Sequence, residues 1–155
     1  MADNEGLLEL PHSIRNVGNQ QHASCSGDDQ IPGAVLVTQP ATNLREPVFI
    51  VKELPGDKWK FVLPNKPDMC LGFIGSPIGD EIKTVSVVKD DGNAHVEWKA
   101  DSGSEELAYI IHMEVDSVDV CWTLSDSARD ESVVEVKKNV GSREQQWLLE
   151  MRSDH

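Results

Sequence analysis

The segments HASCSG (22–27), CLGFIG (70–75) and CWTLSD (121–126) lie at nearly even spacing along this chain of 155 residues. A second set, PVFI (47–50), HVEW (95–98) and QWLL (146–149), advances by the same steps of 48 and 51 residues. Two independent markers in register indicate an internal repeat, and periods of about 20–50 residues are typical of folds built from repeated units. We therefore expect one domain with three repeats, at about 10–54, 55–102 and 103–152.

Short runs typical of β-strands recur throughout the chain, and Gly, Asn and Pro cluster between them, as turns require. Apolar residues alternate within the runs, so that Trp122 and Leu124 share one face of a strand, as do Val96 and Trp98. The pattern predicts twelve strands, at 13–17, 22–26, 34–38, 47–53, 58–63, 69–74, 84–89, 95–100, 107–113, 120–124, 132–137 and 146–151.

Twelve strands in three units of four predict an all-β protein with the β-trefoil fold, in which six strands close a barrel and six cap it as hairpins. One unit cannot bury its apolar face alone, so three must associate. A two-sheet sandwich is the alternative all-β interpretation, but it gives no reason for a threefold repeat. The repeats also predict scaffold roles for Cys25, Trp98, Trp122 and Trp147.

The chain is acidic, with 27 Asp and Glu against 14 Lys and Arg and a formal net charge of −13. This charge disfavours nucleic acid, which is bound by cations that neutralise phosphates, and it disfavours anionic membranes. The N-terminal MADNEGLLEL lacks the features of a secretory signal, and no stretch approaches the roughly 18 apolar residues of a membrane span. We expect a cytoplasmic monomer that binds neither nucleic acid nor membrane. The odd set Cys25, Cys70 and Cys121 predicts buried free thiols.

No arrangement of residues in the sequence indicates an enzyme. The serines lack a G-x-S-x-G elbow, and the five scattered histidines contain no H-E-x-x-H pair. The carboxylate pairs at 28–29, 90–91 and 105–106 fall at turns, where solvated charges are the usual explanation. We expect no catalytic residues, no metal site and no cofactor. Function is then expected in loops that a rigid barrel holds in place.

Two predicted loops stand out. The first follows the second predicted strand, is closed by Gly33, and consists of Gly27, Asp28, Asp29, Gln30, Ile31 and Pro32. The second follows the fifth predicted strand and consists of Pro64, Asn65, Lys66, Pro67 and Asp68. Its prolines restrict φ, which lowers the entropic cost of presenting the neighbouring side chains to a partner. The alternative is that both are ordinary turns.

The final repeat, with CWTLSD, a valine-rich strand and REQQWLLE (143–150), resembles the closing repeat of the mushroom β-trefoil protease inhibitors. The opening IRNVGNQQHASCS (14–26) is similar to the first hairpin of the cospin-like serine protease inhibitors in that group. The resemblance implies a fungal defence protein that inhibits a peptidase, most of all a serine protease, through the loop at 27–33. That loop has no Lys or Arg, and Asp28 and Asp29 would oppose the acidic base of a trypsin pocket. We therefore expect a serine protease other than trypsin, or no serine protease, as the target.

Two alternatives stay open. The mushroom inhibitors of cysteine proteases, the clitocypins and macrocypins, share the trefoil, and that likeness implies that Asn65 could block an asparaginyl endopeptidase. Lys66 is a poor trypsin site because Pro67 follows it. The other alternative is a lectin, because ricin-type trefoils carry a Q-x-W element in each repeat and pair an aromatic platform with Asp and Asn. Here only Gln145–Trp147 offers that element, and Trp147 is better explained as a core residue.

Overall fold

The computed structural model describes residues 10–25, 33–39, 48–64, 66–75, 83–103, 106–125 and 132–151. In these residues no helix is long and apolar enough to cross a membrane. They contain one short 3-10 turn, η2 (Arg143–Gln145), and the strands β1 (Leu10–Asn16), β2 (His22–Cys25), β3 (Leu36–Gln39), β4 (Phe49–Leu54), β5 (Lys58–Leu63), β6 (Lys66–Gly72), β7 (Lys83–Thr84), β8 (Ser86–Lys89), β9 (Lys99–Ser102), β10 (Ala108–Val115), β11 (Val118–Leu124), β12 (Val134–Lys138) and β13 (Trp147–Met151).

Every predicted strand has a counterpart, with two differences. The strand predicted at 84–89 is divided into β7 and β8, because Val85 turns inward and bonds to β12 through its backbone. The strand predicted at 95–100 becomes β9, preceded by isolated backbone pairs at His95 and Trp98. We call β1–β4 the first repeat, β5–β9 the second and β10–β13 the third.

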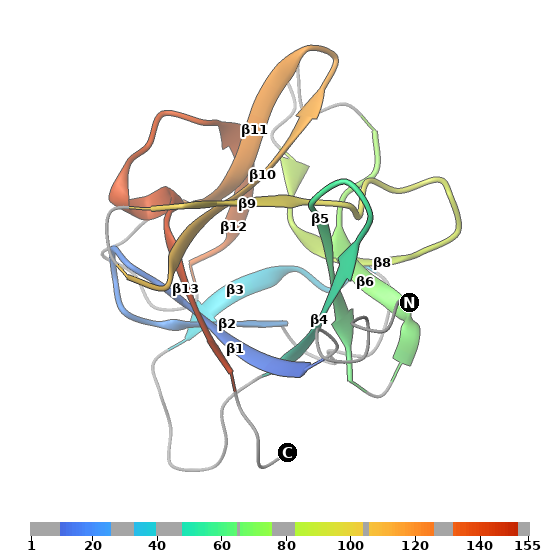
Figure 1. Ribbon diagram of the computed structural model, residues 1–155, viewed down its shortest axis with the longest axis horizontal. Coiled ribbons are helices and arrows are strands. Elements are labelled where there is room, and N and C mark those ends of the chain that lie inside the picture. The colour runs from blue at the N-terminus through green and yellow to red at the C-terminus, as the bar shows by residue number, and fades with distance from the viewer. Residues whose placement is uncertain are drawn as a thin grey trace.

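Strand pairing closes six strands into a barrel. Figure 1 shows how the labelled strands are arranged. β1 pairs with β13 and β4, β4 with β5, β13 with β10, and β10 with β9. Trp59 on β5 and Trp98, just before β9, complete the ring by exchanging backbone hydrogen bonds of 2.6 and 2.8 Å. Closure pairs the backbone groups that an open sheet would leave exposed at its edges.

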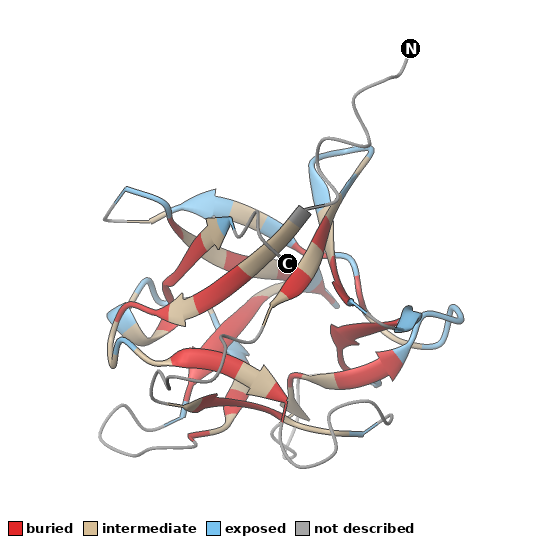
Figure 2. Ribbon diagram, turned by 90° about the horizontal axis from the view of Figure 1, so that it is seen from below, coloured by how far each residue is buried: buried red, intermediate tan, exposed pale blue. Residues whose placement is uncertain are grey.

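The hairpins β2–β3, β6–β8 and β11–β12 pack together against the barrel. Backbone pairs join them to one another: Val35 bonds with Ser86, Val37 with Val133, and β7 with β12. Buried residues lie on the inner faces of the strands, whereas exposed residues gather at the turns (Figure 2). A six-stranded barrel with three hairpins is the β-trefoil, so the fold prediction is confirmed.

Three fully buried tryptophans, Trp98, Trp122 and Trp147, form the centre of the core. The ring centroid of Trp122 lies 5.7 Å from that of Trp98 and 5.8 Å from that of Trp147. The indole of Trp98 donates to the carbonyl of Leu71 at 3.0 Å, and that of Trp147 donates to the carbonyl of Trp122 at 3.1 Å. Each bond joins the last barrel strand of a repeat to its hairpin. In the first repeat the position of these tryptophans is occupied by the buried Phe49, which lies 49 residues before Trp98. Phe49 has no N–H group on its ring, so it cannot form the equivalent hydrogen bond.

The three cysteines are buried and form no disulfide, as the sequence predicts. Desolvation by burial raises the pKa of Cys70 to about 11 and that of Cys121 to about 12, from an ordinary value of 9.0. Both thiols therefore stay protonated, and so poorly nucleophilic, in the folded protein at neutral pH.

We predict that a thiol reagent such as DTNB labels neither Cys70 nor Cys121 in the folded protein at pH 8 and labels all three cysteines in urea. Because the unfolded chain ionises these thiols from about pH 9 while the folded chain does not, stability should fall as pH rises from 9 to 11. Urea unfolding at pH 8 and 10.5 should show a loss of about 1–3 kcal/mol, and a smaller loss in a Cys70→Ala/Cys121→Ala variant. Rapid labelling of both thiols in the folded state would contradict this.

Candidate functional site

A depression of about 580 Å³ lies beside the hairpin of the second repeat. Its walls are formed by Phe73 and Ile74, which follow β6, by the strands β7 and β8, by the loop after β8 and by Gly33. Ile74, at 59% exposure, offers an apolar contact. Its polar lining comes from Lys83, Thr84, Ser86, Lys89, Asp91 and Asn93. Small-molecule sites in proteins have volumes of about 300–1,000 Å³, apolar walls and a few polar groups, so this depression is a candidate binding site.

The loop at 90–95 forms the rim of the depression and is held at both of its ends. The backbone N–H of Asp90 donates to the carbonyl of Asp68 at 3.0 Å, and its carboxylate accepts a hydrogen bond from Lys60 at 2.5 Å. This hydrogen bond raises the pKa of Lys60. His95 and Phe73 exchange backbone hydrogen bonds of 2.8 and 3.2 Å, and their ring centroids are 4.8 Å apart.

The middle of this loop faces solvent. Asp91, Gly92 and Asn93 are exposed, and the backbone N–H of Asn93 donates to the Asp91 carboxylate at 3.1 Å. Gly92 has a φ of +92°, a conformation that side-chain-bearing residues rarely adopt. The sequence predicted solvated turn charges at 90–91. That is accurate for Asp91, whereas Asp90 is paired with Lys60 because the loop folds back against β5.

Gly72 sets the distance between this loop and the hairpin. A Cβ atom at Gly72 would overlap the carbonyl oxygen of His95 and press on the side chain of Val96. The absence of a side chain on this strand therefore permits the backbone of the loop to lie directly against β6.

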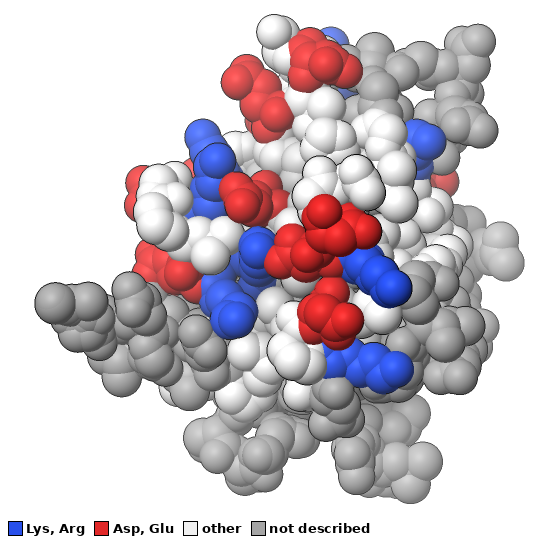
Figure 3. Space-filling model, turned by 90° about the vertical axis from the view of Figure 1, so that its right-hand side faces the viewer, with Lys and Arg blue, Asp and Glu red and all other residues white. Residues whose placement is uncertain are grey.

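A second depression, of about 530 Å³, lies on the other side of the same loop. Its charged lining comes from Lys58, Asp90, Glu97, Lys99 and Glu114. Lys58 lies 3.4 Å from Glu97, and Asp90 is already bound to Lys60. Figure 3 shows the face of the molecule that carries the second repeat, where Lys and Arg side chains lie next to Asp and Glu. Three of the charged residues that line the second depression, Lys58, Glu97 and Asp90, thus already form ion pairs within the protein.

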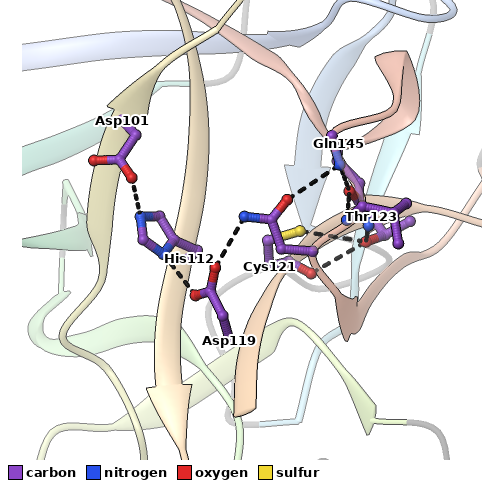
Figure 4. Close-up of polar contacts among 9 residues, drawn as sticks. Asp101, His112, Asp119, Cys121, Thr123 and Gln145 are labelled. Atoms are coloured by element: carbon purple, nitrogen blue, oxygen red, sulfur yellow. Dashed lines mark hydrogen bonds and ion pairs between the residues drawn. The ribbon is translucent and has the colours of Figure 1, made fainter.

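The third repeat contains a polar cluster around His112, which lies between two carboxylates (Figure 4). Its Nδ1 is 2.7 Å from Asp119 and its Nε2 is 2.8 Å from Asp101. The other oxygen of Asp119 accepts a hydrogen bond from Asn139 at 2.9 Å. The sequence predicted isolated histidines, and that is wrong for His112 because the pairing of β10 with β9 and β11 brings both acids beside it. The cluster ties these strands together.

Gln145, which is only 2% exposed, uses all of its side-chain groups inside the protein (Figure 4). Its carbonyl oxygen accepts hydrogen bonds from the backbone N–H groups of Val140 and Gly141 at 2.8 and 2.9 Å. Its amide donates to the hydroxyl of Thr123 at 3.1 Å and to the carbonyl of Lys138 at 2.8 Å. The glutamine of the single Q-x-W element therefore closes the loop of the third repeat.

The loops at 90–98 (DDGNAHVEW) and 139–147 (NVGSREQQW) occupy equivalent positions in the second and third repeats. Gly92 and Gly141 both have positive φ values, of 92° and 74°. The buried Val96 stands where the third repeat has the glutamine, and it packs in a small apolar cluster. The second repeat thus holds this loop by apolar packing, where the third repeat uses an amide that binds the loop backbone.

The predicted protease-binding residues Gly27, Asp28, Asp29, Gln30, Ile31 and Pro32 lie outside the described residues, as does Asn65. Pro64 lies in an exposed turn. Lys66 and Pro67 are exposed, but they begin β6 and do not lie in a loop as the sequence predicted. The predicted boundary is wrong because Leu63 pairs with Lys66 after a register shift between β5 and β6. Both segments stay predicted protease contacts.

Sequence reasoning missed the residues that line the depression. Thr84, Ser86 and Lys89 were placed in a strand, and Lys83 and Asn93 received no role. One signal could have identified the loop at 90–98 from sequence: Gly92 precedes Trp98 by the same interval as Gly141 precedes Trp147. In the described residues, no group of three or more His, Cys, Asp or Glu is placed to hold a metal.

No protein-family model matches the chain, and no curated protein matches it in sequence. Among solved structures it is similar to ThreeFoil, a designed 3-fold symmetric protein, with a TM-score of 0.69 and 12% identity over 90% of this chain and 97% of that one. It is similar to the Macrolepiota procera ricin B-like lectin in complex with lactose, with a TM-score of 0.69 and 16% identity over 92% of this chain and 95% of that one. The exo-β-1,3-galactanase 1,3Gal43A of Clostridium thermocellum matches with a TM-score of 0.74 and 12% identity over 92% of this chain and 30% of that one.

At these identities the likeness defines the class of fold, and the chain is a β-trefoil protein. The β-trefoil fold that the resemblance to the cospin-like inhibitors implies is confirmed, whereas membership of that family is not shown. The Rhizoctonia solani agglutinin and the earthworm R-type lectin C-half share this fold at 14% and 11% identity.

We predict that Gly72→Ala destabilises the protein by about 1–3 kcal/mol, because the added methyl group cannot be accommodated against the His95 carbonyl without backbone movement. Urea denaturation followed by tryptophan fluorescence measures the loss. Asp68→Ala, on an exposed position of the same strand, is the matched control and should change stability by less than about 0.5 kcal/mol. An unchanged midpoint for Gly72→Ala would mean that the loop is not held against β6.

Gln145→Ala should destabilise the protein by about 2 kcal/mol, since it removes the partners of three part-buried backbone groups of the third-repeat loop and of the buried Thr123 hydroxyl. Thermal and urea unfolding measure the effect. Val140→Ala, at a residue that is 74% exposed in the same loop, should be close to neutral. Equal stability of the two variants would show that the glutamine does not anchor the loop.

Proposed function

We propose that this protein is a non-enzymatic carbohydrate-binding β-trefoil that holds a sugar in the depression beside β6–β8. The observation that carries the proposal is the lining itself, in which hydroxyl, ammonium, carboxylate and amide groups surround a cavity of about 580 Å³ with an apolar wall. The lactose complex of the Macrolepiota procera lectin and the match to a galactanase support it, because both proteins handle sugars on or beside a similar fold.

The chemistry of the lining suits a sugar. Sugar hydroxyls both donate and accept hydrogen bonds, so they need acceptors such as the Asp91 carboxylate and groups of both kinds such as the Asn93 amide. Thr84 and Ser86 add two hydroxyls on the opposite wall. An acid and an amide together on one loop match the Asp and Asn that the lectin alternative requires.

The apolar part of the proposed site differs from an aromatic platform. The ring of Phe73 lines the depression but is only 2% exposed, and Trp98, Trp122 and Trp147 are fully buried. Ile74 therefore supplies the exposed apolar contact for the C–H face of a sugar. An aliphatic wall lacks the polarised face of an aromatic ring. We expect weak binding of one sugar unit, with a dissociation constant of about 1 mM.

The lining favours binding over hydrolysis. Glycoside hydrolysis generally needs two carboxyl groups that flank the scissile bond, about 5–9 Å apart. Asp91 is the single carboxylate among the described residues that line the depression. A sugar held there would meet hydrogen-bonding groups without a paired acid and base.

The test is a glycan array followed by calorimetry with each sugar that gives a competed signal. Replacing Asn93 by Ala should weaken binding about tenfold, which corresponds to about 1.4 kcal/mol, because a buried sugar hydroxyl would lose its partner. Ser142→Ala, at the equivalent position of the third-repeat loop, is the matched control and should bind like the unmodified protein.

No binding of any sugar, on the array or in calorimetry at sugar concentrations above about 1 mM, would contradict the proposal. A panel of trypsin, chymotrypsin, subtilisin, papain and asparaginyl endopeptidase then tests the alternative, in which the protein inhibits a peptidase through Asp29 and its neighbours or through Asn65. Inhibition abolished by Asn65→Ala would favour the second loop.

A further inference from the structure

Two depressions lie on either side of the loop at 90–95 and share it as a wall. The first depression is the one of about 580 Å³ beside β6–β8, and the second has about 530 Å³. Residues of the loop alternate between the two linings. A ligand that extends out of the first depression across this loop therefore enters the second. The loop residues that line the first are Asp91 and Asn93, and those that line the second are Asp90, Gly92, Ala94 and His95.

The middle of this loop is open at Gly92. A Cβ built on this exposed glycine would have no heavy atom of the described residues within 4 Å, its two chain neighbours aside. Its backbone N–H and C=O groups form no hydrogen bond within the described part of the chain. A glycine permits close approach of a ligand to the backbone. A sugar chain can therefore cross the loop at Gly92 and bond to its backbone with hydroxyl groups.

The stacked rings of Phe73 and His95 also join the two linings. Phe73 lines the first depression and His95 lines the second, and their ring centroids are 4.8 Å apart. His95 is half-buried, and its ring nitrogens form no hydrogen bond with another described residue. A histidine ring offers a donor and an acceptor, so it can bind sugar hydroxyls from the second depression.

The second lining has two further polar groups that no ion pair engages. Lys99 on β9 and Glu114 on β10 are exposed, and neither forms an ion pair with another described residue. One side chain donates hydrogen bonds and the other accepts them. The two charges together are neutral, so they serve the hydroxyls of an uncharged ligand and do not require a charged one.

We propose that the ligand is a neutral oligosaccharide that occupies both depressions and crosses the loop at Gly92. The inference rests on the proposed sugar-binding function and deepens it, because it names a chain of sugar units as the ligand. One unit lies in the first depression beside Asn93. A later unit of the same chain lies in the second depression, where His95, Lys99 and Glu114 bind its hydroxyls.

Two weak contacts made by one chain give tighter binding than either contact alone. A unit bound in the first depression holds the next units close to the second, so the cost in translational freedom is met once for both. We expect a chain that reaches both depressions to bind about ten- to hundredfold more tightly than its monosaccharide. A chain too short to cross the loop should gain little.

The experiment is calorimetry with three series of neutral sugars, each from one to six units: β-1,3-galacto-oligosaccharides, cello-oligosaccharides and chito-oligosaccharides. The monosaccharide and the hexasaccharide of any other unit that the glycan array identifies are compared in the same way. In a series that binds, affinity should rise at least tenfold between one and six units. The rise should level off once the chain fills both depressions.

Glu114→Ala and Lys99→Ala should each weaken the hexasaccharide about three- to tenfold and leave the monosaccharide unchanged, because only the longer chain reaches the second depression. Asn93→Ala should weaken both sugars. The matched controls are Glu53→Ala on β4 and Lys138→Ala on β12, exposed residues outside both linings, which should alter neither sugar. Urea unfolding of each variant confirms that it is folded.

Equal affinity for the monosaccharide and the hexasaccharide would overturn this inference and leave the sugar-binding function intact. Full retention of hexasaccharide binding by both Glu114→Ala and Lys99→Ala would do the same. Weaker binding of the monosaccharide by Glu114→Ala would also overturn it, because a single unit would then already occupy the second depression. If no sugar binds in these series or on the array, the proposed function fails together with the inference.

Discussion

The backbone pair between Trp59 and Trp98 is the contact that turns the sheet into a barrel. β5 and the last strand of the second repeat meet through these two residues, whose N–H and C=O groups exchange hydrogen bonds of 2.6 and 2.8 Å. The side chain of Trp98 then reaches inward, donates to the hairpin carbonyl of Leu71 and packs edge-on against Trp122. Trp98 thus closes the barrel through its backbone, and its side chain both packs in the core and attaches the hairpin of the second repeat. The loop at 90–97 leads directly to it, so barrel closure also positions the rim of the candidate site.

Pseudo-threefold symmetry explains why the site belongs to one repeat. Equivalent loops follow the hairpins of the second and third repeats, each with a glycine of positive φ and a buried tryptophan. In the third repeat Gln145 satisfies backbone groups of its own loop, and Asp119 is engaged by His112 and Asn139. In the second repeat Val96 anchors the loop by apolar packing. The loop of the second repeat therefore needs no glutamine to hold its backbone, and its exposed Asp91 and Asn93 line the depression that we propose as the site.

The sequence predicted where strands occur, but it did not predict where some of them begin or divide, or which side chains meet across strands. Strands were predictable because alternation and turn residues are local, and each predicted strand has a counterpart. The divided strand at 84–89 and the start of β6 at Lys66 were not, since each depends on pairing with a partner distant in the chain. Likewise, His112 meets Asp101 and Asp119 through strand register, which the spacing of single residues does not reveal.

The repeated markers and the alternation of apolar residues by themselves determined the all-β trefoil, the three buried thiols and the scaffold role of Trp98, Trp122 and Trp147. Only the tertiary structure decided where a ligand can bind. The lining of the depression is assembled from Gly33, the two residues after β6, β7–β8 and the loop at 91–93, which no local pattern joins. Gly72 and Val96 make that assembly possible by close backbone approach and apolar anchoring. The local sequence pattern shows which face of a strand is buried. A binding depression instead depends on which strands and loops the fold brings together, and a local pattern does not contain that information.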